Sequence, residues 1–380
     1  MRHFGFNMKT ALKALLAVTL FSSPVLCAAA TVKAPEKKEE VRDTIVVHGM
    51  VLKGRVTSLR HDKLSFKLIY SEGRNHIAYK DIDSIHTKYN YHISYDRKDI
   101  EGRVIGIVDN EYLRVKTDKK TILVKIADID NFVMSVQDDD SIENRIRNNN
   151  PYLSGSFNVG LELESAPTRE KDQLDVMMDL THKKAKNEIR FYLAYEFDTT
   201  QTDDTEKVQN KDELTAILAD RYFYKANDFV YGSLMGEFDR PRHIQNRFAP
   251  SVGYGHRFKW GKDKWIQPAI GLAYVTTNYT EQDLYPQNNF AAAALSLGGK
   301  YQFNDLMLIN SLLVDGNFLY YPSLADPGQD WISRTNIFFT IPLLDFLSLK
   351  LAWQWINDSN PDPSIGNNKT TTNIYFGFDF

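Results

Sequence analysis

The sequence predicts an all-β protein whose larger part is a 12-stranded antiparallel transmembrane β-barrel, preceded by a small periplasmic β-module. The first residues resemble an export signal. From residue 152 onward, segments of about ten residues alternate apolar and polar side chains, and the last of them ends on Phe380. Such alternation turns one face of each strand toward lipid and the other toward the barrel lumen.

Residues 1–30 have the features of a cleaved secretory signal peptide. A positively charged start precedes an apolar run, residues 14–26, which is too short to span a bilayer, and Ala28 and Ala30 offer a small-residue cleavage site. The alternative is lipidation of Cys27, which the bulky leucine before it disfavours. Since Cys27 is the only cysteine, the mature chain is expected to contain no thiol and no disulfide.

Composition narrows the class of protein further. The mean hydropathy is −0.40, and no later stretch approaches eighteen apolar residues, so helical membrane spans are not expected. A barrel remains compatible with low mean hydropathy because half of each strand is polar. The formal net charge of −3 is too small to indicate a nucleic-acid partner, and none is expected.

Residues 43–136 contain an internal repeat. Gly-Arg-Val at residues 54–56 recurs at 102–104, and Asp-Ile-Asp at residues 81–83 recurs at 128–130. Apolar and polar side chains alternate between these anchors, which predicts short antiparallel strands. We therefore predict two small SH3-like or Sm-like sheets packed together as one periplasmic module.

Several tyrosine side chains of this module are predicted either to form a contact surface for a partner or to pack in its core. Tyr70 and Tyr79 are expected to pack in the core. The tyrosines concerned are Tyr70, Tyr79, Tyr89, Tyr91 and Tyr95. Charged residues 31–42 and polar residues 137–151 are predicted to be linkers on either side of the module.

Residues 152–380 form the predicted barrel. Its twelve segments begin near residues 152, 172, 187, 212, 228, 247, 265, 290, 306, 331, 346 and 370. Short turns alternate with longer connections around 198–211, 239–246, 277–289, 320–330 and 357–369. An even number of strands with short turns on one side is typical of bacterial outer-membrane barrels, in which the short turns are periplasmic. A soluble β-sandwich is the alternative, but it does not require such unequal ends.

The last segment has an outward apolar row that ends on an aromatic residue. This row, Ile374, Phe376, Phe378 and Phe380, resembles the sorting strand that the outer-membrane assembly machinery recognises. The alternative is an edge strand of a soluble sheet, which would expose four large apolar side chains and favour aggregation. We therefore expect the assembly machinery and outer-membrane lipid as partners.

The predicted lumen face carries both acids and bases. Acids come mainly from the first strands and bases from later ones, which predicts either a transverse field across a narrow selective pore or ion pairs that plug the lumen. The candidate residues are Glu162, Glu164, Asp175, Asp179, Arg190, Glu196, Arg221, Arg257, Arg334 and Lys350. The sequence does not decide between these two alternatives.

A catalytic site is not predicted. The barrel contains three histidines, His182, His243 and His256, and no serine motif accompanies any of them. The five histidines of the module match no metal-ligand spacing, so no metal and no cofactor are expected. We predict that the protein is not an enzyme.

The middle of the barrel resembles a known family. An aromatic pair, Tyr222 and Tyr224, precedes a short turn; an E-x-D motif and an arginine before P-x-x-G-x-G follow. This pattern is similar to that of the YdiY-like family of salt-induced outer-membrane proteins, a domain of unknown function, and the resemblance covers residues 152–380. The remaining motif positions are Glu237, Asp239, Arg247, Pro250, Gly253 and Gly255.

The resemblance implies an outer-membrane address and, from the family's name, a salt or osmotic response. The preferred function is a narrow pore for ions or small solutes. The first alternative is a non-conducting envelope scaffold that displays a periplasmic module, which would contact peptidoglycan or a periplasmic protein. A lipid-modifying barrel enzyme is the second alternative. From the residues alone, a salt-bridged loop at the barrel mouth explains the acids and arginines between residues 237 and 247 best.

Overall fold

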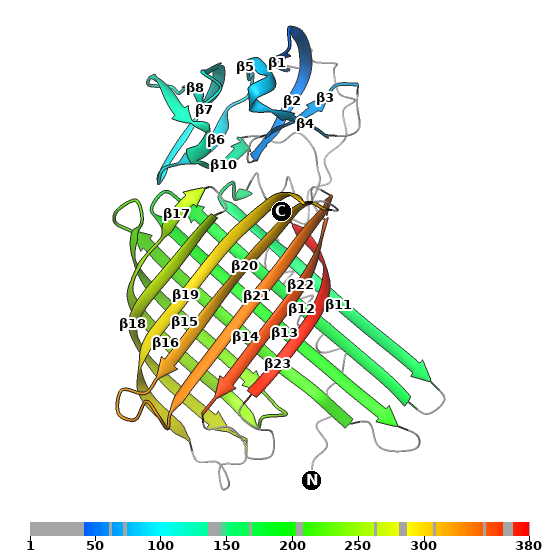
Figure 1. Ribbon diagram of the computed structural model, residues 1–380, viewed down its shortest axis with the longest axis vertical. Helices are drawn as coiled ribbons and strands as arrows, with labels where there is room; N and C mark the ends of the chain where they lie inside the picture. The colour runs from blue at the N-terminus through cyan, green and yellow to red at the C-terminus, as the bar shows by residue number, and fades with distance from the viewer. Residues whose placement is uncertain are drawn as a thin grey trace, which may run out of the picture. The chain divides into compact units, whose positions relative to one another are not determined.

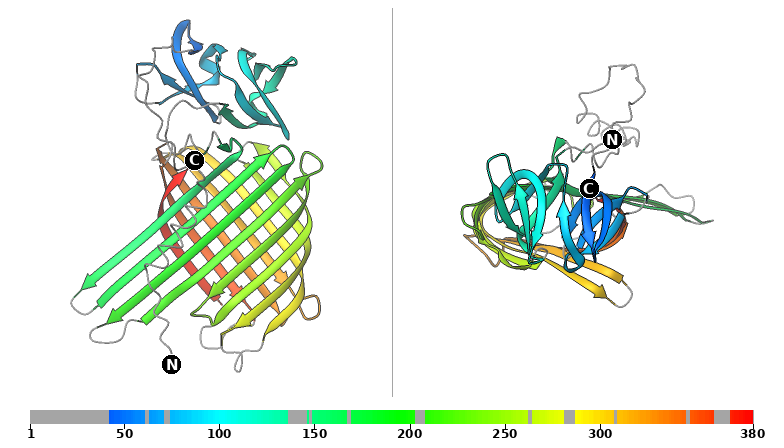
Figure 2. Two further views of the ribbon diagram at one scale, coloured as in Figure 1. Left: turned by 180° about the vertical axis from the view of Figure 1, so that it is seen from behind. Right: turned by 90° about the horizontal axis from the view of Figure 1, so that it is seen from above.

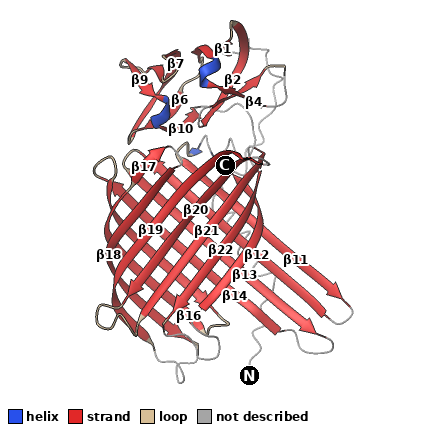
Figure 3. Ribbon diagram, in the orientation of Figure 1, coloured by secondary structure: helices blue, strands red, loops and turns tan. Residues whose placement is uncertain are grey.

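The computed structural model describes residues 42–380, apart from 61–62, 71–73, 136–145, 147–148, 167–168, 203–207, 262–263, 281–286, 307–308, 345–346, 360–367 and 380. The predicted signal peptide and almost all of the first linker lie outside these residues. Strands dominate the described part of the chain, and short helical turns occur in the N-terminal module (Figure 3). Among the described residues, no helix is long and apolar enough to cross a membrane.

The N-terminal module consists of two five-stranded antiparallel sheets (Figure 1). The first has the order β4-β3-β2-β1-β5. Its elements are β1 (Asp43–Val47), β2 (Met50–Arg60), β3 (Lys63–Leu68), β4 (Arg74–Ala78), the 3-10 helix η1 (Tyr79–Asp81) and β5 (Ile82–His86). The second has the order β10-β6-β7-β8-β9. Its elements are β6 (Tyr91–Tyr95), β7 (Lys98–Val108), β8 (Tyr112–Lys116), β9 (Thr121–Lys125), η2 (Ile126–Asp128) and β10 (Ile129–Met134).

The two sheets repeat one topology. In each, four consecutive strands pair in order, a 3-10 turn follows, and the fifth strand returns to pair with the first. The repeated glycines do the same work in both: a side chain on Gly54 would collide with the Lys67 carbonyl, and one on Gly102 with the Lys116 carbonyl. Close strand approach therefore explains the glycine of the repeated motif.

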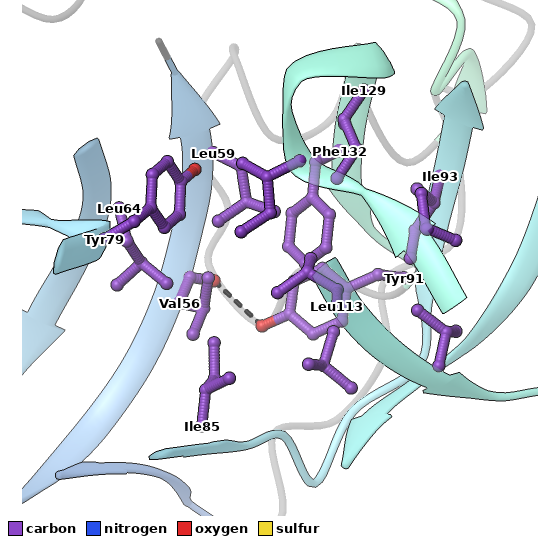
Figure 4. Packing of buried hydrophobic residues seen from close by; sticks show 14 of the residues in the cluster. Val56, Leu59, Leu64, Tyr79, Ile85, Tyr91, Ile93, Leu113, Ile129 and Phe132 are labelled. Carbon is purple, nitrogen blue, oxygen red and sulfur yellow. Dashed lines mark hydrogen bonds between the residues drawn. The ribbon is translucent and has the colours of Figure 1, made fainter. Parts of the chain in front are cut away.

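The module has one apolar core that both sheets share (Figure 4). Val56, Phe66 and Ile85 of the first sheet lie in the same cluster as Ile93 and Leu113 of the second. A sheet of about forty residues is too small to bury a sizeable core alone, so the two sheets bury their apolar faces against each other.

The predicted core tyrosines behave differently from one another. Tyr79 is buried in η1, as expected, but Tyr70 is 94% exposed. Tyr70 follows the end of β3, where the alternation stops, so its side chain has no sheet face to cover. Tyr91 joins the core as well, and its ring stacks on Phe132 at a centroid distance of 4.4 Å.

A buried polar link joins the two sheets. The Asp43 carboxylate of β1 accepts hydrogen bonds from the Val56 N–H at 2.9 Å, the Lys88 N–H at 2.7 Å and the Tyr91 hydroxyl at 2.8 Å. The hydroxyl also lies 2.9 Å from the Val56 carbonyl (Figure 4). Burial and the neighbouring Asp43 carboxylate raise the pKa of the Tyr91 hydroxyl well above its ordinary value, which keeps it protonated as a donor.

Replacement of Asp43 by alanine is expected to destabilise the module. The change removes the acceptor of three buried or half-buried donors, and each unsatisfied donor costs about 1–3 kcal/mol. Hydrogen exchange on peptides from residues 43–134 of the full chain should show faster exchange in both sheets. Asp118→Ala, at an exposed acid of the same module, is the matched control. Exchange that accelerates in β1 and β2 alone would contradict a link between the sheets.

Residues 153–379 form a closed antiparallel barrel of twelve strands (Figures 1 and 2). Its elements are β11 (Leu153–Ala166), β12 (Arg169–Lys184), β13 (Asn187–Thr202), β14 (Val208–Phe223), β15 (Asp228–Asp239), β16 (Ile244–His256), β17 (Phe258–Gly261), β18 (Lys264–Tyr279), β19 (Asn288–Leu306), β20 (Ile309–Pro322), β21 (Trp331–Leu344), β22 (Leu347–Asp358) and β23 (Asn368–Asp379). Only Arg257 separates β16 from β17, and both pair with β18, so they form one barrel strand. The first and last strands close the barrel through four residue pairs, from Ser156↔Asp379 to Val159↔Phe376.

The predicted number of strands is confirmed, whereas some strands extend further than predicted. Residues 198–202, expected in a loop, continue β13 and pair with β12 as far as Thr202↔Arg169. The ladder continues there because backbone hydrogen bonds do not depend on apolar side chains. The ninth strand begins at Ile309, three residues after its expected start, and the turn before it follows Leu306. That segment is apolar on both faces, so its alternation does not mark the turn.

The outer face of the barrel is apolar. Large side chains that point outward from successive strands are exposed, and the alternate residues on the same strands are buried. These outward residues include Leu218, Val230, Leu234, Phe248, Val252, Tyr254, Ile270, Leu272, Tyr274, Leu297, Ile374 and Phe376. An apolar outer band around a closed sheet is the arrangement that a bilayer requires of a β-barrel. Ile374 and Phe376 thus lie on the lipid face, and Phe380 lies outside the described residues.

Candidate functional site

The lumen contains most of the charged residues selected from the sequence. Eight of the ten candidates have described side chains, and these side chains point inward. They are Asp175, Asp179, Arg190, Glu196, Arg221, Arg257, Arg334 and Lys350. Glu162 and Glu164 lie in β11, where the side chains are outside the described part of the structure. Among these eight, the acids lie on β12 and β13, and the bases other than Arg190 lie on later strands, as the sequence indicated. Further acids, Glu188, Glu237 and Asp358, lie beside lumen bases and pair with them, so the lumen contains ion pairs rather than two separate arcs of charge.

Glu237 is the centre of a buried network near the long-loop end of the lumen. Its carboxylate lies 2.9 Å from the Arg334 guanidinium and 3.3 Å from that of Arg247. Asp358 bridges Arg247 and Arg242, with an oxygen 3.1 Å from Arg242 Nη2. The side chains of Glu237, Arg247 and Asp358 are 4% exposed or less. Thr277 and Thr215 accept further hydrogen bonds from Arg247 and Arg334.

This network also explains the acids and arginines between residues 237 and 247. The expected salt-bridged loop is only part of it: Asp239 accepts a hydrogen bond from the Arg242 N–H at 3.1 Å and closes the turn between β15 and β16. The guanidinium groups of Arg242 and Arg247 then reach across the lumen to Asp358 of β22. The pairing is therefore a layer across the barrel as well as a brace of one loop.

Glu188 is the centre of a second network near the short-turn end. Arg257 donates two hydrogen bonds to its carboxylate, at 2.7 and 2.9 Å, and Arg221 approaches to 3.2 Å. The Arg257 guanidinium also lies 4.8 Å from the Phe223 ring centroid and 4.7 Å from that of Trp265. A planar guanidinium that binds a carboxylate in its plane and aromatic rings on its faces is well compensated for the loss of water.

Smaller pairs and apolar clusters fill the space between the two networks. Arg190 pairs with Asp179 through two hydrogen bonds at 2.6 and 2.9 Å. Lys211 lies 3.2 Å from Glu196, and Lys350 donates to Ser156 at 3.0 Å. Asp179 and Glu196 are thus neutralised by lumen bases, whereas Lys350 and Asp175 are bound by the neutral side chains of Ser156 and Gln173.

Two apolar clusters occupy the lumen between strands that are distant in sequence. One joins Met235, Val275, Phe290, Tyr321 and Ile332. The other includes Met177, Tyr192, Phe338 and Tyr375. A cavity beside them, bordered by Glu196, Glu213 and Lys369 among others, measures about 10 Å³, room for about one water molecule. Side chains from distant strands thus meet across the described lumen.

The family-motif glycines make room for aromatic rings. A side chain on Gly255 would collide with the Phe229 ring, and one on Gly253 with the Tyr231 ring and the backbone of β18. Phe229 and Tyr231 of β15 lie across from these glycines in the register Phe229↔Gly255 and Tyr231↔Gly253. Glycines that face inward thus leave room for large rings of the neighbouring strand.

The aromatic and proline residues of the motif face outward. Tyr222 and Tyr224 are exposed by 45% and 40%, and the Tyr224 ring lies against that of Tyr254 at 6.3 Å. Pro250 points outward from β16, where the ladder to β18 has no residue pair, so its missing N–H costs no hydrogen bond. Aromatic rings near the short turns are typical of the interfacial girdle of outer-membrane barrels.

Sequence reasoning did not select Glu188, Asp358 or Lys369. Glu188 is in phase with Arg190 on β13, and Asp358 is in phase with Lys350 on β22. Lys369 is out of phase with the outward residues Ile374 and Phe376 on β23, which places it on the lumen face. The alternation could therefore have included them. Their partners could not have been found in this way, because the period gives a face of the strand but not the residue across the lumen.

Among the described residues, the three barrel histidines lie beside an acid, beside an aromatic ring and in a turn, and in the module the Ser65 hydroxyl lies 3.0 Å from His76 Nδ1. His256 faces outward with its Nδ1 2.6 Å from Asp228, and His182 lies against the Tyr152 ring. His243 closes the turn before β16 with a positive φ of 53°. Within the described ranges, no group of three or more histidine, cysteine or acidic side chains is placed to hold a metal ion.

The motif residues lie in the part of the chain that a family model covers. The model described as "Protein of unknown function, DUF481" matches residues 157–380. The chain belongs to the DUF481 family. The resemblance to the YdiY-like family is consistent with this membership. The N-terminal module lies outside the DUF481 match, and no curated protein matches the chain.

Solved structures of outer-membrane proteins are similar to this DUF481 protein only distantly. The translocator domain of the autotransporter NalP from Neisseria meningitidis is 9% identical, with 60% of this chain and 87% of that chain covered and a TM-score of 0.32. The outer membrane channel DcaP of Acinetobacter baumannii is 10% identical, with 90% and 95% covered and a TM-score of 0.26. The β domain of the Bordetella autotransporter BrkA is 11% identical, with 60% and 97% covered and a TM-score of 0.28. Similarities at this level say nothing of function.

Replacement of Glu237 by glutamine is expected to destabilise the barrel strongly. The change leaves Arg247 and Arg334 without their shared anion, and breaking a buried ion pair from one side costs about 3–5 kcal/mol. Urea-dependent unfolding, followed by the heat-modifiable gel shift of the folded barrel, measures the loss. Asp220→Asn on the exposed face of β14 makes the same chemical change outside the network. Equal midpoints for the two variants would show that the network does not hold the barrel together.

Proposed function

We propose that the protein is a closed outer-membrane anchor that carries its N-terminal module into the periplasm. One observation supports this function above the others: both ends of the described lumen are crossed by buried ion-pair networks, and the space between them is filled by apolar clusters. Such a lumen holds the barrel rigid in the membrane and offers no continuous aqueous path. The preferred function from sequence, a narrow pore, is therefore replaced by its alternative, the scaffold.

The direction of the chain supports a periplasmic module. The first barrel strand begins at Leu153, at the end of the barrel that carries the short turns and the last described residue of β23. In outer-membrane barrels of even strand number the short turns face the periplasm. A module that ends at Met134 and precedes β11 in the chain would then lie on the periplasmic side.

We infer that the barrel works without catalysis, and that its partners are outer-membrane lipid and the assembly machinery. The outward row of Ile374 and Phe376 supports the second partner, and the apolar outer band supports the first. A salt or osmotic response remains a prediction that comes from the family resemblance. A closed anchor could serve such a response through its module, since the module alone has an open surface.

The closed lumen predicts that the refolded mature protein does not conduct ions. Incorporated into planar bilayers, it should give no steady current steps at either polarity. Replacing Phe338 and Tyr375 together by alanine should introduce conductance, because both rings belong to the central apolar cluster. Discrete steps in the unmodified protein, altered by Arg334→Gln, would favour the selective pore instead.

Cysteine labelling tests the side on which the module lies. The predicted mature chain has no cysteine, so single substitutions can be labelled without background. On intact Gram-negative cells, a membrane-impermeant maleimide should label Ala325→Cys in the long loop between β20 and β21. Lys119→Cys, on an exposed turn of the module, should react only after the outer membrane is permeabilised. Labelling of both positions on intact cells would place the module outside the cell and refute the periplasmic address.

A further inference from the structure

The second sheet of the module borders a cavity of about 610 Å³. This volume lies within the roughly 300–1,000 Å³ that is typical of ligand sites. Its walls come from the connection between the two sheets, from β7, from β8 and the turn after it, and from the residue after β10. The side chains that matter most are Lys88, Tyr89, Asn90, Arg103, Lys116 and Ser135.

Two of these cationic side chains lie side by side on neighbouring strands. Arg103 of β7 lies directly opposite Lys116 of β8, and both side chains are exposed. The first sheet repeats the arrangement, with Arg55 opposite Lys67. Like charges directly opposite on neighbouring strands destabilise a sheet. A bound anion between Arg103 and Lys116 would turn this repulsion into attraction.

The cationic side chains that line the cavity have no ionic partner among the described residues. Within the described part of the chain, the side chains of Lys88, Arg103 and Lys116 make no hydrogen bond or ion pair. By contrast, the arginines described in the barrel lumen form ion pairs with carboxylates. A free guanidinium fork beside two ammonium groups matches the geometry and charge of a carboxylate.

Neutral groups in the same wall fit a hydroxyl-rich ligand. The Ser135 hydroxyl is buried and has no hydrogen-bond partner among the described residues. Its position is fixed, because the Ser135 N–H donates to the Asn90 carbonyl at 2.8 Å. Tyr89 also lines the cavity, with its ring packed against the module core and 5.7 Å from the Arg55 guanidinium. These groups offer specific contacts that an inorganic anion cannot use.

Two acids limit the charge that the site accepts. Glu101 and Asp118 also line the cavity, so three cations face two carboxylates. The excess of one positive charge suits a ligand with isolated carboxylates, and the acids accept hydrogen bonds from its hydroxyl or amide groups. A dense polyphosphate would be repelled by both acids. The lining therefore favours a carboxylated sugar over a phosphate.

We propose that this cavity binds a glycan or glycopeptide that carries isolated carboxylates, which in the periplasm is the chemistry of the cell wall. Arg103 and Lys116 hold the carboxylate, and the Ser135 hydroxyl donates a hydrogen bond to the sugar. The biological role of this site rests on the proposed function, since only a periplasmic module meets that polymer. The anchor would then connect the outer membrane to the wall.

The test uses the full-length protein in detergent, incubated with purified peptidoglycan sacculi and with a soluble disaccharide–tetrapeptide as competitor. Binding should be retained in Lys125→Glu, which makes the same charge change on β9, outside the cavity. In Arg103→Glu binding should fall at least tenfold, while hydrogen exchange in β7 and β8 slows because an opposite-charge pair with Lys116 replaces the like-charge pair. Arg103→Gln is the second variant and should weaken binding in the same direction.

Unchanged binding in Arg103→Glu and Arg103→Gln would overturn the proposal. Absence of binding between the wild-type protein and sacculi would overturn it as well. Displacement by inorganic phosphate but not by the disaccharide–tetrapeptide would assign the cavity to phosphate and equally reject a carboxylated glycan. The protein in detergent exposes its module whichever side of the membrane it occupies in cells. Failure here therefore concerns the cavity alone, whereas conductance and cysteine labelling test the closed anchor and its address.

Discussion

Charged side chains that are buried inside a barrel must be neutralised by one another or held by hydrogen bonds, and the rest of this structure depends on that constraint. Isolated buried charges cost several kcal/mol, so each acid needs its bases at hydrogen-bonding distance. Glu237 with Arg247 and Arg334, and Glu188 with Arg221 and Arg257, meet this requirement at the two ends of the lumen. Because the partners come from different strands, each pair also fixes the position of one strand relative to another.

The apolar clusters follow from the same constraint. A twelve-stranded barrel is wide, and ion pairs alone do not fill its middle. Phe338 and Tyr375 from the last strands meet Met177 and Tyr192 from the first, and this packing removes the water that would otherwise weaken the pairs. On β15 and β16 the glycines opposite Phe229 and Tyr231 let large rings lie flat against the wall. Charge pairing and close packing together make the barrel a rigid membrane body.

The period of two was sufficient to predict the strands, their number and their faces. It indicated that Arg190, Glu196, Arg257 and Arg334 point inward, because a half-buried strand alternates strictly. It could not predict that Arg242 meets Asp358, 116 residues away, since that contact depends on the curvature of the closed sheet. Strand ends were also underestimated, because the backbone ladder continues through polar residues such as those at 198–202. In the module, the repeat predicted two sheets, but the Asp43–Tyr91 link between them has no sequence signal beyond an acid before a strand.

The lumen and the module therefore differ in how their charges are used: paired inside the barrel, free in the cavity beside Arg103. The central claim is that water does not enter the barrel, and hydroxyl-radical footprinting of methionines measures this most directly. Met177 and Met235 lie in the two lumen clusters and are 1% exposed, whereas Met50 of the module is 62% exposed and serves as the internal reference. The closed lumen predicts oxidation of Met177 and Met235 at least tenfold slower than that of Met50 in the folded protein. Comparable oxidation rates at all three positions would show a hydrated lumen and contradict the account.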